Sequence, residues 1–99
     1  MTKLDFYLRV DLAEKEKNIK VFNEAKLHLG VIEYKLNNLE ESINLLSDLI
    51  KDSPESYEAY YFRGLSYIGL NEIEKAKIDL SVASEHGLEA AKKDLDKLK

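Results

Sequence analysis

The chain has 99 residues, of which 34% are charged and 44% are apolar, with a formal net charge of −4 and no cysteine. This length fits a single domain, and the absence of cysteine excludes a disulfide framework and thiolate chemistry. Fifteen basic residues are interspersed with nineteen acidic ones, so the basic face that nucleic-acid binding requires is not expected. The apolar runs are too short to span a membrane and no signal-peptide pattern is visible, so we expect a cytoplasmic protein, unless the sequence is part of a longer chain.

The first 22 residues fit either a strand or a helix. Apolar and polar residues alternate between positions 4 and 12, which indicates a half-buried strand. The same segment has apolar residues at helical spacing, and Thr2 with Asp5 resembles a capping box. We favour the helix, because Leu12 falls in register with Leu46 and Leu80 when the sequence is shifted by 34 residues, as the remnant of an earlier repeat would. Such a segment either covers the helices that follow or forms an arm that pairs with another chain or enters a groove.

The charged residues 13–18 either continue a helix or make a turn. The next helix is predicted over residues 19–36, because the asparagine pair that follows tolerates the left-handed conformation of a helix terminus. Its partner is predicted over residues 39–51, whose apolar positions form a single stripe. Pro54 ends this pair of helices and opens the next one.

Three further helices follow. The first covers residues 55–70, and Asn71 marks the turn into a second over residues 72–85. Gly87 suits the left-handed position after the end of that helix. Residues 88–99 form a last helix with one apolar and one charged face, which we expect to cap the domain.

The sequence repeats itself at a period of 34 residues. A shift by this number places Gly30 on Gly64, and 9 of the 34 pairs aligned in this way are identical, where composition alone would give roughly two or three. In each copy the glycine of the first helix is followed by a leucine of the second, Leu46 or Leu80. Small and large residues can thus meet across a tightly packed helix pair.

At these residues the chain resembles the tetratricopeptide repeat proteins, whose pattern is W-x2-L-G-x2-Y, then A-x3-F, then P, at the same period. The second copy matches this pattern at Tyr60, Gly64, Tyr67, Ala76 and Leu80, and the first at Gly30, Ser42, Leu46 and Pro54. The chain departs from the pattern at Lys26, Glu33, Arg63 and Leu88.

The resemblance implies an all-α fold in which antiparallel helix pairs stack as a short right-handed α-solenoid. Accordingly, the single domain divides into an N-terminal covering segment (1–18), repeat one (19–54), repeat two (55–87) and a capping helix (88–99). Two repeats are usually too few for stability, so the terminal segments or a second subunit are expected to add burial. The resemblance also implies a non-catalytic scaffold for protein–protein interaction.

In such repeats the first helix of each pair lines a concave groove, and the resemblance assigns the ligand-facing positions to residues 19–36 and 55–70. Helical spacing independently puts each set on one face of its helix. The floor is mostly apolar and aromatic, which favours an apolar or amphipathic peptide over the clamped C-terminal carboxylate that some members bind. The predicted partner-binding residues are Glu24, Leu27, His28, Val31, Tyr34, Glu58, Tyr61, Phe62, Leu65 and Ile68.

Two other interpretations of this face stay open. An apolar stripe at helical spacing is often covered by its own chain, here by the first 18 residues or by the last helix. It could equally be a homodimer interface, which makes a self-associating structural subunit the alternative function. Glu24 and Glu58 either complement the dipoles of their helices or form an acidic rim for a basic ligand.

Catalytic and cofactor chemistry is not expected. His28 and His86 lack the further ligands that a metal site needs, and no serine has a histidine with a carboxylate behind it at helical reach. A glycine-rich phosphate loop is also missing from the sequence. We therefore expect no enzyme, no metal and no cofactor, and as partner another protein or peptide segment, or a second copy of the chain.

Overall fold

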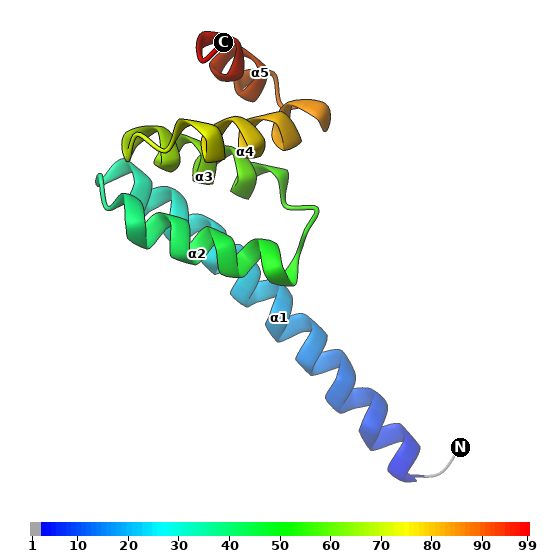
Figure 1. Cartoon of the computed structure of the whole chain (residues 1–99). Helices are drawn as coiled ribbons and strands as arrows, with labels where there is room; N and C mark the ends of the chain where they lie inside the picture. Colours follow the sequence, from blue (N-terminus) through cyan, green and yellow to red (C-terminus); the bar gives the residue numbers. More distant parts are fainter. Residues whose placement is uncertain (1–2) are drawn as a thin grey trace.

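The computed structural model describes the backbone of residues 3–99 and the side chains of residues 14–99. This part of the chain folds into five helices and no strand, so the predicted all-α class is confirmed. Each helix packs against the next one along the chain, and α1 also contacts α3 (Figure 1). The helices are α1 (Lys3–Lys35), α2 (Leu39–Asp52), α3 (Tyr57–Gly69), α4 (Ile73–Glu85) and α5 (Glu89–Lys97).

The first helix differs most from the prediction. α1 is continuous from Lys3, so the strand considered for residues 4–12, the turn considered for residues 13–18 and a helix start near Ile19 are wrong. The physical reason is that the sequence before Gly30 contains neither glycine nor proline, while its charged segment consists of good helix formers. Thr2 of the expected capping box lies outside the described residues.

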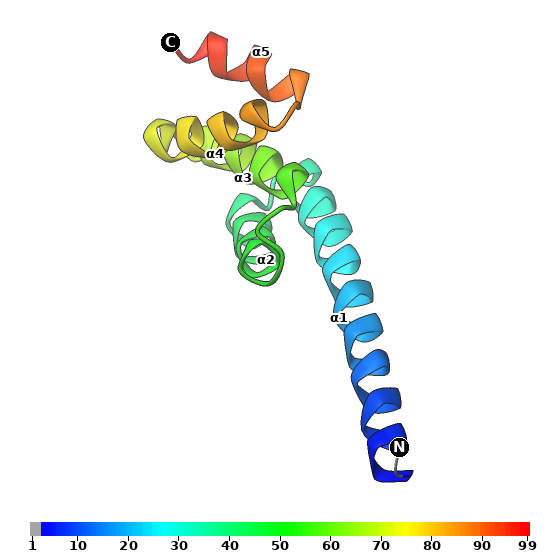
Figure 2. The same cartoon turned by 90° about the vertical axis from the view of Figure 1, so that its right-hand side faces the viewer.

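The N-terminal half of α1 projects from the rest of the molecule. Figures 1 and 2 show that this half runs beyond the end of α2 and away from the other four helices. The molecule is accordingly elongated, with extents of 60 × 27 × 17 Å. In this arrangement the projecting half lies over neither the first helix pair nor the predicted groove.

Three of the four connections between helices are turns of the same type. Asn37 (φ 66°), Asn71 (φ 61°) and Gly87 (φ 97°) adopt the left-handed conformation two residues after the ends of α1, α3 and α4. After α1, the amides of Asn37 and Asn38 donate to carbonyls three and five residues back, at 3.0 and 2.8 Å, which is the Schellman pattern. The same two bonds follow α3 and α4. The predicted terminators at Asn37 and Gly87 are thus confirmed.

Small residues let the helices approach closely. A Cβ atom on Gly30 would lie 2.5 Å from Leu46 Cδ2, and one on Gly64 would lie 3.1 Å from Leu80 Cδ2, so the predicted pairing of small with large residues is confirmed. Fully buried alanines complete the contacts of α3, α4 and α5. They are Ala59, Ala76, Ala83 and Ala91.

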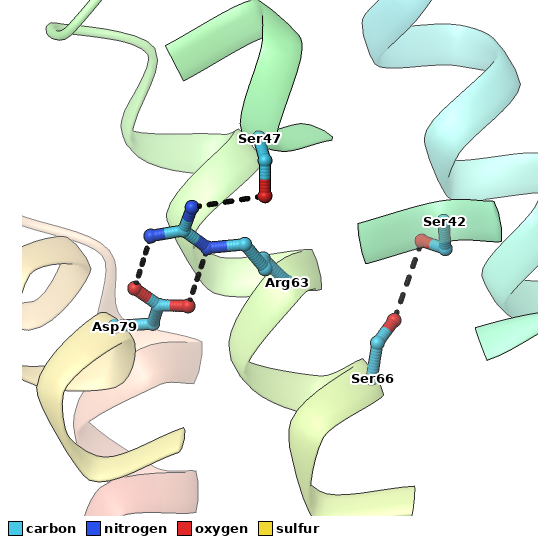
Figure 3. A network of polar contacts seen from close by, with 5 residues as sticks. All are labelled: Ser42, Ser47, Arg63, Ser66 and Asp79. Carbon is cyan, nitrogen blue, oxygen red and sulfur yellow. Dashed lines mark hydrogen bonds and ion pairs between the residues drawn. The ribbon is translucent and has the colours of Figure 1, made fainter. Parts of the chain in front are cut away.

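A polar network joins α2, α3 and α4 (Figure 3). Arg63 of α3 donates from Nε and Nη2 to the two carboxylate oxygens of Asp79 on α4, each at 2.7 Å, and from Nη1 to Ser47 Oγ on α2 at 3.2 Å. Asp79 is buried, and this hydrogen-bonded pairing raises the pKa of Arg63 above its ordinary value. Nearby, Ser66 Oγ lies 3.3 Å from Ser42 Oγ of α2. The departure from the repeat pattern at Arg63 therefore has a structural role.

Candidate partner-binding face

The predicted apolar positions of α1 and α3 meet where these two helices are in contact. Tyr34 of α1 lies against Phe62 of α3, with ring centroids 5.8 Å apart, and Phe62 also contacts Tyr61 of its own helix at 5.1 Å. Every apolar member of the set is partly exposed; none is fully buried. We call this set the α1/α3 face; its residues are Leu27, Val31, Tyr34, Tyr61, Phe62, Leu65 and Ile68.

Part of the α1/α3 face also belongs to the core. Leu27 and Phe62 pack against a buried cluster formed by Leu46, Leu49 and Ala59. Truncating either side chain would thus disturb the helix packing as well as the surface. Val31 and Leu65 are not among the residues packed against this cluster, and both are partly exposed.

The last helix holds one edge of the face. Tyr61 Oη donates a hydrogen bond of 2.8 Å to Asp94 Oδ2 on α5. Burial, together with this bond and the charge of Asp94, raises the pKa of Tyr61 to about 12. Tyr61 and Ile68 also pack against the buried cluster of α4 and α5. Asp94, expected on the charged outer side of the last helix, therefore faces the α1/α3 face.

Two of the three predicted polar members lie at one end of the face. Glu24 and Glu58 are exposed, and each lines a surface hollow that also includes Leu27. The hollow containing Glu58, of about 330 Å³, is also lined by Tyr57 and His86, whose rings stack with centroids 3.9 Å apart. His28 is exposed and lines neither hollow.

A further hollow lies at the opposite end. It has a volume of about 360 Å³ and is lined by Tyr34, Lys35, Leu65 and Ile68, with the turn after α1 beside it. Gly69 and Leu39 also line it, and Leu39 packs closely against Gly69. The α1/α3 face thus runs between an acidic end and an end that carries one lysine.

Neither a metal site nor a membrane span is found in the described part of the chain. Among these residues no group of three or more histidine, cysteine or acidic side chains could hold a metal ion. None of the described helices is long and apolar enough to cross a membrane.

No protein-family model, no curated protein and no solved structure matches this chain. The resemblance to tetratricopeptide repeats therefore stays a prediction from the sequence.

One feature of α1 was missed in the sequence. Large apolar side chains on the side turned away from α3 are strongly exposed, among them Phe22 (66%) and Leu36 (64%). The signal that would have revealed them is their spacing, because Phe22, Leu29 and Leu36 lie seven residues apart.

Proposed function

We propose that this protein is a non-catalytic scaffold that binds an apolar or amphipathic segment of another protein on its α1/α3 face. The observation that carries the proposal is the composition of this face: seven apolar and aromatic side chains from two helices, each left partly exposed. Aromatic side chains in a shallow concave surface are typical anchors for a partner, since they give large contact area at low entropic cost.

We further propose that the helix pairs form a short solenoid of the tetratricopeptide type. Equivalent positions of the two 34-residue copies behave alike, which supports this proposal. Asn37 and Asn71 have the same backbone conformation, and Gly30 and Gly64 each face the equivalent leucine. The missing closing proline, replaced by Leu88, coincides with the start of α5.

The dimensions and charges of the face suggest the kind of ligand. Leu27 to Tyr34 spans about 11 Å of helix, so two to three turns of an amphipathic helix would cover it. The acidic end near Glu24 and Glu58 favours a ligand with a basic residue at the end that lies there. The interaction of exposed charges would set the orientation of the ligand more than its affinity.

A displayed library of random peptides of 15 residues tests the proposal. The wild-type chain should enrich sequences with apolar residues at helical spacing, and the synthetic peptides should bind with dissociation constants in the micromolar range by fluorescence anisotropy. Leu65→Glu and Val31→Glu should weaken this binding at least tenfold, because each places a charge in the centre of the face. These positions are preferred to Leu27 and Phe62, which also hold the core.

The matched control is Ile78→Glu, since Ile78 is an exposed apolar residue of α4 (66%) that does not belong to the face. It should leave peptide binding unchanged. Failure to enrich any sequence, or peptides that bind Leu65→Glu as tightly as wild type, would contradict the proposal.

A further inference from the structure

The outer side of α1 carries a second apolar surface, which is separate from the α1/α3 face. Phe22, Leu29, Ile32 and Leu36 are 66%, 48%, 49% and 64% exposed, and the exposed Ala25 lies among them. The spacing of these five residues alternates between three and four, which places them in one row along the helix, turned away from α3. We call this row the outer stripe.

The internal repeat shows what such a row contacts in the other copy. Positions 25, 29 and 32 of α1 correspond to Ala59, Arg63 and Ser66 of α3 at the shift of 34 residues. In α3 all three lie against α2: Ala59 is fully buried in its cluster with Leu46 and Leu49, and Arg63 and Ser66 contact serines of α2. A helix therefore covers this row in the second copy, whereas in α1 the more apolar row is open to solvent.

The other end of the molecule is closed. Leu80 and Ala83 of α4 correspond to Leu46 and Leu49 of α2 at the shift of 34 residues, and they already pack against the fully buried Ala91 of α5. A second copy could therefore not use its α4 to cover α1 of the first in a head-to-tail manner. We therefore consider a contact between two outer stripes, which is isologous and closed.

The outer stripe is complementary to itself in the antiparallel direction. With a two-fold axis near Leu29, Phe22 lies opposite Leu36 of the second copy, and the small Ala25 opposite its Ile32. Leu29 meets the same residue of the second copy. Beside the stripe, Lys26 and Glu33 already have partners within the chain, Asp52 at 3.2 Å and Asn38 at 2.8 Å, so the contact rests on the apolar residues. We propose that the chain forms a homodimer in which the outer stripes of two α1 helices pack antiparallel.

The size of the contact predicts its strength. The stripe extends over 14 residue steps, about 21 Å of helix. Burying it on both copies would remove on the order of 1,000 Å² of surface from solvent, which is at the low end for specific interfaces. We therefore expect a reversible dimer with a dissociation constant in the micromolar range.

Analytical ultracentrifugation of the full chain between 1 µM and 1 mM tests the proposal. The wild type should show a monomer–dimer equilibrium, and Leu29→Glu should raise the dissociation constant at least 30-fold because it places two carboxylates face to face. Ile78→Glu is again the matched control and should dimerise like the wild type. A circular dichroism spectrum with unchanged helix content would show that Leu29→Glu remains folded. A wild-type monomer at 1 mM, or a dimer that tolerates Leu29→Glu, would overturn the proposal.

Because the chain has no cysteine, single-cysteine variants can test the direction of packing. Leu29→Cys should form a disulfide-linked dimer on mild oxidation, while Ile78→Cys should not. Phe22→Cys alone should not cross-link, but a mixture of Phe22→Cys and Leu36→Cys should. Efficient self-cross-linking of Phe22→Cys would overturn the antiparallel arrangement. Neither experiment depends on peptide binding, so the outcome does not depend on the function proposed for the α1/α3 face.

Discussion

The ion pair between Arg63 and Asp79 is the contact on which the junction of α2, α3 and α4 depends most. The side chains are only 18% and 3% exposed, and the guanidinium also lies over the rings of Tyr60 and Tyr67 at 5.6 and 5.9 Å from their centroids. Burying two charges is costly, and their attraction roughly offsets that cost when both are present. When only one partner is removed, the other charge stays buried without the attraction that offsets its burial.

We therefore predict that Arg63→Leu, which restores the residue of the repeat pattern, destabilises the fold by roughly 3 kcal/mol because Asp79 is left unpaired. The double variant Arg63→Leu with Asp79→Leu should recover most of this loss. Urea unfolding followed by circular dichroism measures both. An unchanged free energy of unfolding for Arg63→Leu alone would mean that the pair does not form.

At this scale the sequence predicted packing better than polar contacts. Gly30 and Leu46 could be paired because the 34-residue repeat shows the same spacing twice. Asp79 could not be identified as buried, because a single acidic residue on a helix is usually solvated and its partner lies 16 residues away. The same holds for Asp94, whose contact with Tyr61 depends on the angle at which α5 leaves the turn at Gly87.

At the scale of secondary structure, the last helix is held to α3 by a bond that depends on pH. In an unfolded chain tyrosine ionises near pH 10, whereas the pKa of Tyr61 in the folded protein is raised to about 12. A tyrosine whose pKa is raised on folding stabilises the folded state. This contribution is fully present at pH values below the pKa of the unfolded chain. This contribution is lost as the pH rises from about 10 to about 12.

Tyr61→Phe should consequently be less stable than the wild type by about 1 kcal/mol at neutral pH, because the hydrogen bond to Asp94 is lost. Its stability should fall less steeply than that of the wild type between pH 10 and pH 12. Urea midpoints measured across this range give the comparison, and amide hydrogen exchange should show earlier opening of α5 in the variant. Parallel pH profiles of the two proteins would contradict the assignment.

Most ends of α2 to α5 follow from sequence signals with a local cause, such as asparagine or glycine after a helix. The prediction that Pro54 opens the third helix is wrong: Pro54 lies in a turn, and α3 begins at Tyr57 after the N-cap Ser56. The length of α1 does not follow from such signals, since the register of Leu12 with later leucines suggested a separate helix, whereas no residue between positions 13 and 18 stops one. Which side of α1 stays open depends on the helices around it, and helical spacing alone cannot show this.

For the molecule as a whole, the projecting half of α1 contributes little to the fold. Residues 14–20 are all exposed, and an isolated helix of this length is marginal in water. We predict that deletion of residues 1–17 changes the free energy of unfolding of the remainder by less than about 0.5 kcal/mol, as is usual for surface changes. Urea titrations at equal, low protein concentration provide the test. Loss of folding would instead identify the segment as a cap that the fold requires.

The Schellman turns after α1 and α3 are matched in length, in hydrogen bonding and in the conformation of their asparagine. A segment cut from Asn38 to Asn71 therefore begins and ends in the same local geometry. Such a cassette could be copied in tandem without redesigning a junction. Each inserted copy would add two helices between α1 and α5 while leaving both ends of the molecule as they are. The chain thus contains a 34-residue building block from which longer proteins of graded length could be engineered.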